Sequence, residues 1–254
     1  MTPLLQQWLL DHDMLTGRVH HMDALDLLSL LPDASVDAII TDPPYGLAGR
    51  VFDLPHKKYS AVNEDWDLFV PTEWMAECER VLKHGGSVVC FGGRQSIYQV
   101  AAVGLSRGWR LVNDITWEKP DAPPNFTGRM LTETTERALW FCPSGEGWTY
   151  NLPIAKAMNH GKNLRDVWTY GITRGDRIHP TQKPLQLMER CVQLFTKPGD
   201  LVVDLFAGSG TTLEAARRHG RRYLGSDITL EYVKAANKRL ALPITAQMFA
   251  EEAA

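Results

Sequence analysis

The sequence has few cysteines, little net charge and no long apolar run. Its four cysteines are widely spread over 254 residues and form no Cys-x-x-Cys pair. A disulfide framework and a zinc site are therefore both disfavoured, and we assign no metal ligands. No apolar run approaches the roughly 20 residues of a membrane span. Because the N-terminus also lacks the basic and apolar parts of a signal peptide, we expect a cytoplasmic protein with no membrane partner.

The net charge of −3 does not by itself indicate a nucleic-acid partner, but the charges are unevenly distributed. Seven aspartates and one arginine lie in residues 1–42, whereas basic residues predominate between residues 156 and 183. A protein with both signs of charge can present a basic face to phosphates and stay soluble. Random surface patchiness explains the same pattern equally well, so charge alone leaves the partner open.

Apolar, β-branched runs alternate with helical periods along most of the chain. The pattern predicts strands near residues 18–21, 36–40, 87–91, 111–117, 138–142, 201–205 and 222–225. It predicts helices near residues 3–14, 24–31, 71–83, 95–107, 184–195, 211–219 and 230–240, the third closed by Gly85 and Gly86. This order indicates one α/β domain over residues 1–254, with a doubly wound, mostly parallel sheet.

Two stretches lack any period. Residues 46–66 are expected to form an irregular, mobile loop near the substrate, since a loop this long inside a compact domain is usually functional or disordered. Residues 143–178 are rich in basic and aromatic side chains and are expected to form a small inserted segment.

The first candidate site is the turn that follows the apolar run 36–40. It consists of Asp42, Pro43, Pro44 and Tyr45. Ligands of open α/β sheets bind beyond the carboxyl ends of strands, where these residues are expected. The prolines stiffen the turn and leave its carbonyls free to accept hydrogen bonds. A carboxylate and free carbonyls suit a substrate amino group, and the tyrosine offers a flat surface to a planar ring. The alternative is a proline-rich surface turn.

The second candidate site is the glycine-rich turn at residues 206–212, between an expected strand and helix. Glycines let the backbone approach a ligand closely, and Asp227 ends the next strand, where an acidic residue commonly binds a ribose diol. Both a dinucleotide and S-adenosylmethionine fit this layout. The dinucleotide fingerprint requires a glycine where Leu213 stands. Asp42 and Asp204 would repel a pyrophosphate but suit an ammonium and a sulfonium, so S-adenosylmethionine is favoured over NAD. A tight structural turn is the remaining alternative.

With both turns in view, the sequence resembles the amino-methylating DNA methyltransferases of the class with permuted motif order, the β-class. As in that class, Asp-Pro-Pro-Tyr lies in the N-terminal half and Phe-x-Gly-x-Gly in the C-terminal half. Residues 80–87, 115–119 and 179–184 resemble further motifs of the family, so the likeness covers most of residues 18–240. The resemblance implies a Rossmann-like methyltransferase fold, S-adenosylmethionine as cofactor and double-stranded DNA as partner.

The resemblance also implies residue roles. Asp42 and the Pro43 carbonyl would accept hydrogen bonds from the target amine, and Tyr45, after Pro44, would stack on a flipped-out base. The predicted cofactor residues include Asp42 and Asp204, whose charge suits the cationic groups of the cofactor. The full set is Asp23, Ala24, Asp42, His179, Thr181, Lys183, Asp204, Phe206, Gly208, Ser209, Gly210, Thr211, Thr212 and Asp227. Candidate DNA contacts are Arg50, Lys57, Lys58, Lys156, Lys162, Arg165, Arg174 and Arg177, with Trp168 or Tyr170 to stack or wedge.

Aspartate before the two prolines is more usual in N6-adenine members of the family and serine in N4-cytosine members. We therefore expect an adenine target, with cytosine as the alternative, and a recognition role for residues 143–178. Members that act on RNA or on a protein glutamine more often carry asparagine there. A regulator that binds DNA without catalysis and an NAD oxidoreductase are further alternatives. A homodimer and a cognate restriction endonuclease are expected partners by analogy.

Overall fold

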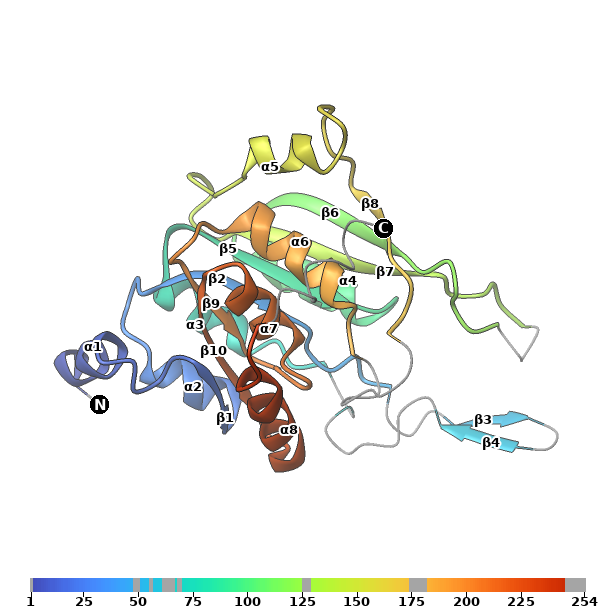
Figure 1. Ribbon diagram of the computed structural model, residues 1–254. Helices are drawn as coiled ribbons and strands as arrows, with labels where there is room; N and C mark the ends of the chain where they lie inside the picture. Colours follow the sequence, from blue (N-terminus) through green and yellow to red (C-terminus); the bar gives the residue numbers. More distant parts are fainter. Residues whose placement is uncertain are drawn as a thin grey trace.

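The computed structural model describes residues 2–47, 51–54, 57–60, 67, 70–124, 129–173 and 182–244. Within them, eight strands form one sheet (Figure 1). In sheet order these are β1 Arg18–His21, β10 Arg222–Asp227, β9 Leu201–Asp204, β2 Val36–Thr41, β5 Leu82–Gly92, β7 Thr135–Cys142, β6 Arg110–Glu118 and β8 Val167–Thr169. Neighbouring strands are parallel except where β7 pairs with β5 and β6. The predicted doubly wound, mostly parallel sheet is confirmed.

Helices cover both faces of this sheet. They are α1 Pro3–Asp11, α2 Ala24–Leu30, α3 Trp74–Val81, α4 Ser96–Ser106, α5 Leu152–Ala157, α6 Leu185–Phe195, α7 Thr211–Arg218 and α8 Leu230–Leu240. Successive side chains of a strand point to opposite faces. Accordingly Ile39 packs in the core with α2, α3 and α4, whereas Ile40 packs with α6 and α7. No helix in the part of the chain that the structure describes is long and apolar enough to cross a membrane.

Strand β2 lies between β5 and β9, and the direction of winding reverses there. Its residue Ala38 pairs with Ser87 of β5 and with Val202 of β9. From β2 the chain continues outward to β5, whereas from β9 it continues to β10 on the other side. Such a reversal is where open α/β sheets bind ligands. Both predicted turns follow these two central strands, so the topology brings them to one crevice.

The structure differs from the prediction at the end of α3. The helix ends at Val81, and β5 begins at Leu82 rather than near residue 87. Gly85 is therefore part of β5 and does not cap the helix. It has a φ of +76°, and a Cβ atom added there would lie 2.2 Å from the carbonyl oxygen of Gly147. A close approach of two backbone segments explains this glycine, and local sequence carries no sign of it.

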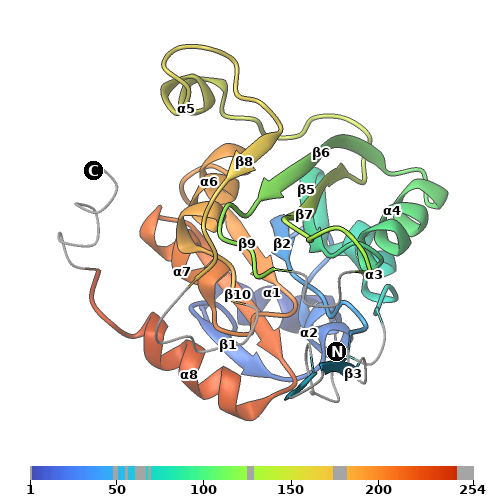
Figure 2. The same cartoon turned by 90° about the vertical axis from the view of Figure 1, so that its right-hand side faces the viewer.

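Both stretches predicted to be irregular contain regular structure. Residues 46–66 include an antiparallel hairpin of β3 Val51–Leu54 and β4 Lys57–Ser60. Residues 143–178 contribute α5, which stands off the sheet beyond β6 and β8 in both views, and β8, which extends the sheet beside β6 (Figures 1 and 2). The Trp168 ring is buried in the core, and its Nε1 donates to the Arg165 carbonyl. The prediction that Trp168 contacts DNA is therefore wrong.

Candidate active site

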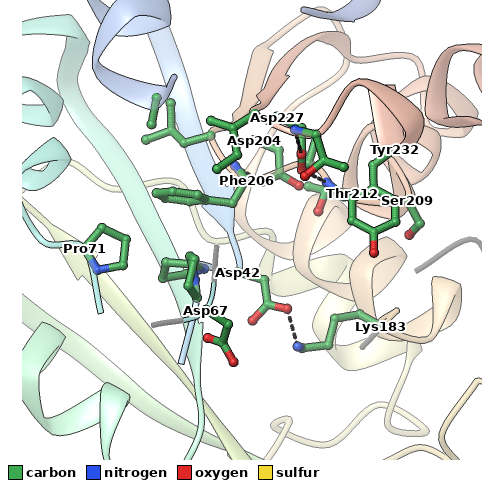
Figure 3. Close-up of a pocket in the computed structure, with 18 of the residues that line it drawn as sticks. Asp42, Asp67, Pro71, Lys183, Asp204, Phe206, Ser209, Thr212, Asp227 and Tyr232 are labelled. Atoms are coloured by element: carbon green, nitrogen blue, oxygen red, sulfur yellow. Dashed lines mark hydrogen bonds and ion pairs between the residues drawn. The ribbon is translucent and has the colours of Figure 1, made fainter. Parts of the chain in front are cut away.

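A pocket opens at the carboxyl edge of the sheet, beside the ends of β2 and β9 (Figure 3). The predicted catalytic and cofactor residues in its lining are Asp23, Ala24, Asp42, Pro43, Pro44, Tyr45, Lys183, Asp204, Phe206, Gly208, Ser209, Thr211, Thr212 and Asp227. Gly210 lies outside the lining, directly before α7. The predictions for His179 and Thr181 fall outside the described residues. Two turns more than 150 residues apart in the sequence therefore share one pocket.

The turn after β2 is held by a carboxylate that the sequence did not single out. Asp67 is 2% exposed and accepts hydrogen bonds from the backbone N–H groups of Tyr45, Gly46 and Leu47, at 2.6, 2.8 and 3.1 Å. Successive N–H groups that converge on one anion fix the backbone of a turn. Asp67 lies between the aperiodic residues 46–66 and the predicted helix 71–83, so no local pattern indicates this role.

Beyond this turn, charged side chains form a buried cluster around Tyr45. The Tyr45 hydroxyl lies 2.7 Å from Asp42 Oδ1 and 3.0 Å from Glu136 Oε2. The Lys183 ammonium contacts Asp42 Oδ2, drawn as a dashed line in Figure 3, and lies 3.0 Å from the Tyr45 hydroxyl and 3.3 Å from Glu136 Oε2. Lys119 completes the cluster with an ion pair of 3.0 Å to Glu136. Sequence reasoning missed Glu136, which is the second residue of β7.

The pKa shifts in this cluster follow from burial and charge. Burial lowers the pKa of Lys183, but Asp42 and Glu136 outweigh it, so the pKa is raised and Lys183 stays an ammonium. Burial raises the pKa of Asp42 against the opposing effect of Lys183. For Glu136, Lys183 and Lys119 outweigh burial and lower its pKa. Burial and the two carboxylates raise the pKa of Tyr45 well above its usual value, so the phenol stays protonated.

The turn after β9 is built differently, around backbone conformation. Gly208 and Gly210 have φ values of +48° and +72°, a backbone region that residues with a Cβ atom rarely adopt. The N–H of Gly208 donates to Asp227 Oδ2 at 2.8 Å, and the N–H of Thr229 donates to Asp227 Oδ1 at 2.8 Å. Asp227 thereby joins the glycine turn to the end of β10. Burial raises its pKa, and these hydrogen bonds oppose that shift.

Asp204 lies between the two turns and is 2% exposed. It accepts hydrogen bonds from the Thr41 hydroxyl at 2.8 Å and the Phe206 N–H at 3.2 Å. Burial raises the pKa of Asp204 to about 6, although hydrogen bonds from Thr212, Thr41 and Phe206 counteract it. Asp204 is therefore mostly ionised at neutral pH and gains a proton in mild acid.

The charge of the lining decides which cofactor fits. Among the residues that the structure describes, its charged side chains are five carboxylates and one ammonium, from Asp23, Asp42, Asp67, Asp204, Asp227 and Lys183. A pyrophosphate placed here would be repelled, whereas a cation would be attracted. The same lining contains apolar side chains, among them Leu205, Phe206 and Ile228, that suit an adenine ring. The residues present therefore fit S-adenosylmethionine, with its ammonium, sulfonium and adenosyl parts.

These features define an α/β enzyme that binds a cationic adenosyl cofactor beside a carboxylate-bearing turn. The chain belongs to the DNA methylase family, whose profile matches residues 36–238. It is 37% identical over 235 residues to the Type II methyltransferase M2.DpnII of Streptococcus pneumoniae, covering 87% of this chain and 88% of the relative. The protein is therefore a DNA methyltransferase, and S-adenosylmethionine is its cofactor.

Solved structures share the fold. The crystal structure of the M1.HpyAVI–SAM complex is similar with a TM-score of 0.68 at 30% identity, covering 89% of this chain and 99% of that chain. PvuII DNA methyltransferase, described as cytosine-N4-specific, has a TM-score of 0.69 at 20% identity and 93% coverage of both chains. At that identity the second likeness concerns the fold alone.

Of the predicted DNA contacts, the three whose side chains the structure describes do not line the pocket. Lys156 of α5 and the nearby Lys162 and Arg165 are exposed on the segment beyond β6 and β8. Lys57 and Lys58 belong to β4, of which the structure describes the backbone. The predictions for Arg50, Arg174 and Arg177 fall outside the described residues. All eight stay predictions.

The pocket also contains residues that sequence reasoning did not select. They are Leu47, Asp67, Pro71, Gln182, Leu205, Ala207, Ile228, Thr229 and Tyr232. Ile228, Thr229 and Tyr232 follow Asp227 closely in the sequence, so proximity to a predicted ribose-binding residue was an available signal. Pro71 and Asp67 reach the pocket through tertiary packing and had no such signal.

Proposed function

We propose that the protein methylates the N6 amine of a flipped-out adenine in double-stranded DNA, and that it belongs to the permuted β-class. The observation that carries the proposal is that Asp42, after β2, lines the same pocket as the turn at residues 206–212. In the chain the Asp-Pro-Pro-Tyr turn precedes the glycine turn, the order expected of that class. A carboxylate beside a cofactor pocket is what amine methylation needs.

The proposed chemistry assigns one task to each residue of the first turn. S-adenosylmethionine, when bound, supplies an electrophilic methyl group. Asp42 and the Pro43 carbonyl accept hydrogen bonds from the amine, which favours the sp³ form whose lone pair can attack. Holding the reacting atoms in line contributes about 7–11 kcal/mol to lowering the barrier in favourable cases. Asp42 need not be a strong base, since the amine loses its proton after the C–N bond forms.

Tyr45 is proposed to stack on the extruded base. Stacking on an aromatic side chain is worth about 1–3 kcal/mol per base and offsets part of the cost of base flipping. In the structure the Tyr45 ring lies against Gly93, where an added Cβ atom would be 2.9 Å from Tyr45 Cδ2. The hydroxyl is held by Asp42 and Glu136. Gly93 and the hydrogen bonds of the hydroxyl thus limit the movement of the ring, which supports a role as a stacking platform.

The proposed cofactor roles run along the other side of the pocket. Asp227 would bind the ribose hydroxyls, and Asp23 with Ala24 would lie beside the adenine. The methionine end would be held by Phe206, Gly208, Ser209, Gly210, Thr211, Thr212 and Lys183, with Asp42 and Asp204 attracting its cationic groups. The shared lining and its negative charge support this arrangement.

Cytosine N4 is the alternative target, because the matched family includes both N6 and N4 enzymes. Support for adenine comes from Asp42 itself, since aspartate at that position is more usual among the adenine enzymes this sequence resembles. We further propose that residues 143–178 contact the recognition sequence. A homodimer and a cognate restriction endonuclease are proposed partners, the latter because relatives carry the name Type II methyltransferase.

One experiment tests the target directly. The protein is incubated with methyl-labelled S-adenosylmethionine and duplex DNA, and the DNA is digested to nucleosides. We expect the label in N6-methyladenine. Label in N4-methylcytosine would overturn the base assignment, and label in no nucleoside would overturn the proposed function. A protein that binds duplex DNA but transfers no methyl group would instead support the regulator.

A further inference from the structure

Lys183 contacts the same carboxylate that the proposed function reserves for the target amine. Its ammonium donates to Asp42 Oδ2, and Figure 3 shows the two side chains meeting across the pocket. The Lys183 side chain is 6% exposed, so water screens its charge weakly. An amine that shares Asp42 with this ammonium would be bound directly beside a positive charge.

Methyl transfer makes that neighbour unfavourable. The N–CH₃ bond forms as the S–CH₃ bond breaks, so positive charge moves from sulfur to the target nitrogen. An ammonium next to that nitrogen opposes the transition state more than the ground state, and interactions of this kind lower kcat. After the bond forms, the proton of the methylated nitrogen passes to Asp42 and then to solvent. Asp42 accepts it more readily once Lys183 has moved away.

A second anion for Lys183 lies within reach. Glu136 Oε2 is 3.3 Å from the Lys183 ammonium, so a small rotation of the lysine side chain moves the ammonium from Asp42 toward Glu136. Glu136 lies on β7. Its other carboxylate oxygen, Oε1, forms an ion pair of 3.0 Å with Lys119. It also accepts from the Tyr45 hydroxyl at 3.0 Å. Its side chain is 18% exposed, and it is not part of the pocket lining.

We propose that Glu136 is a positioning residue, which draws the Lys183 ammonium away from Asp42 when the target amine binds and keeps the Tyr45 hydroxyl in place meanwhile. The inference rests on the proposed function, because it requires an amine at Asp42. Lys119 holds Glu136 at the position where it can receive Lys183. After the exchange the Asp42 carboxylate keeps the hydrogen bond of the Tyr45 hydroxyl and gains that of the amine, while Lys183 stays paired with Glu136.

The test is a double-mutant cycle on methyl transfer to DNA with Glu136→Gln, Lys183→Met and the double variant. Glutamine keeps an acceptor for Tyr45 but has no charge to attract Lys183. We expect Glu136→Gln to lower kcat by about 10-fold or more, while S-adenosylmethionine affinity changes by less than about twofold. The cycle is measured at saturating S-adenosylmethionine, because Lys183 is also a proposed cofactor contact. In the Lys183→Met background the same substitution should have little further effect on kcat, because no ammonium is left to reposition.

The pH profile of kcat/KM shows whether the charge of Glu136 acts on Asp42. The titratable groups around Asp42 are Lys183, Tyr45, Glu136, Asp204 and the Cys90 thiol. Removing the Glu136 charge leaves Asp42 with a closer ammonium and one like charge fewer. The acid limb of the Glu136→Gln profile should therefore move to lower pH. A limb that stays in place would show that the Glu136 charge does not act on Asp42.

Two further variants serve as controls. Glu136→Asp keeps the charge and should restore the position of the acid limb and part of kcat. Asp114→Asn likewise replaces a carboxylate by an amide, in an exposed ion pair between Asp114 of β6 and Arg137 of β7. It should leave kcat within about twofold of wild type. Thermal unfolding of each variant shows that it is folded.

The outcomes distinguish the two proposals. An active wild-type enzyme in which Glu136→Gln and Lys183→Met multiply independently, or in which the acid limb stays fixed, overturns the role of Glu136 alone. A wild-type enzyme that methylates cytosine overturns the choice of base, and the cycle still tests Glu136 because cytosine also presents an amine. A wild-type enzyme that methylates no DNA base overturns the proposed function and this inference with it.

Discussion

The Thr41 hydroxyl donates a hydrogen bond of 2.8 Å to Asp204 Oδ1. Thr41 is the last residue of β2 and Asp204 the last of β9, so this bond joins the two strands that present the catalytic and cofactor turns. Both side chains are buried. The bond therefore fixes the position of one turn relative to the other and helps to keep the Asp204 carboxylate ionised.

Cofactor binding should weaken in mild acid because of Asp204. Its pKa is raised by burial to about 6, so the carboxylate gains a proton as the pH falls from 7 to 5 and no longer attracts a cation. We expect S-adenosylmethionine affinity to fall by up to about tenfold over this range. Calorimetric titration at several pH values measures it. Asp204→Asn should bind more weakly at pH 7 and show a flatter profile; an equally steep profile in that variant would assign the effect to another group.

Replacing Asp42 should abolish chemistry without unfolding the protein. Asp42→Ala removes the proposed acceptor of the amine, and it leaves Lys183 with Glu136 as a remaining anion. We expect methyl transfer to fall by at least about 100-fold, the usual effect of removing a group that stabilises the transition state. Circular dichroism and S-adenosylmethionine binding serve as controls for folding and for the cofactor pocket. Near wild-type turnover would refute the role given to Asp42.

Gly93→Ala should impair catalysis through Tyr45. The added methyl group would lie 2.9 Å from Tyr45 Cδ2, and the ring cannot retreat freely because Asp42 and Glu136 hold its hydroxyl. We expect kcat/KM for DNA to fall by about tenfold or more with cofactor affinity unchanged.

Gly104→Ala is the matched control for that substitution. It also places a methyl group against an aromatic ring, 3.1 Å from Phe141 Cζ, but on the buried side of α4 and outside the pocket lining. Its effect should appear in thermal unfolding, with kcat within about twofold of wild type. Equal losses of kcat in both variants would show that general destabilisation, and not the Tyr45 ring, explains the Gly93 result.

Asp67→Ala should loosen the catalytic turn. The substitution removes the acceptor of the backbone N–H groups of residues 45–47. A buried donor left without a partner costs about 1–3 kcal/mol unless a water molecule accepts its hydrogen bond. We expect a lower free energy of unfolding and a higher KM for DNA. Asp67→Asn keeps one acceptor oxygen and should lose less in both measurements. Equal behaviour of the two variants would show that the hydrogen bonds to this turn contribute little.

The sequence by itself determined the doubly wound sheet and the position of both functional turns. Apolar runs such as 36–40 and 201–205 report burial directly, and the residues that follow such strands reach the ligand-binding edge in any open α/β sheet. The glycines of the cofactor turn and the stiff Asp-Pro-Pro-Tyr turn are local signals, since each concerns the backbone within a few residues. Charge within those turns was enough to favour a cationic cofactor over a dinucleotide.

Tertiary structure alone decided the support of the site. Glu136 and Asp67 act on a turn 91 and 22 residues away from them, across other elements, and a contact of that kind leaves no period in the sequence. Gly85 was predicted to cap a helix because it follows the helical pattern of residues 71–83, yet its close approach to the backbone of Gly147 explains it. Trp168 was a candidate both to stack on DNA and to pack in a core, and β8 places it in the core. Local sequence reports backbone preference and burial, whereas pairing between distant segments depends on which surfaces fit together when the chain packs.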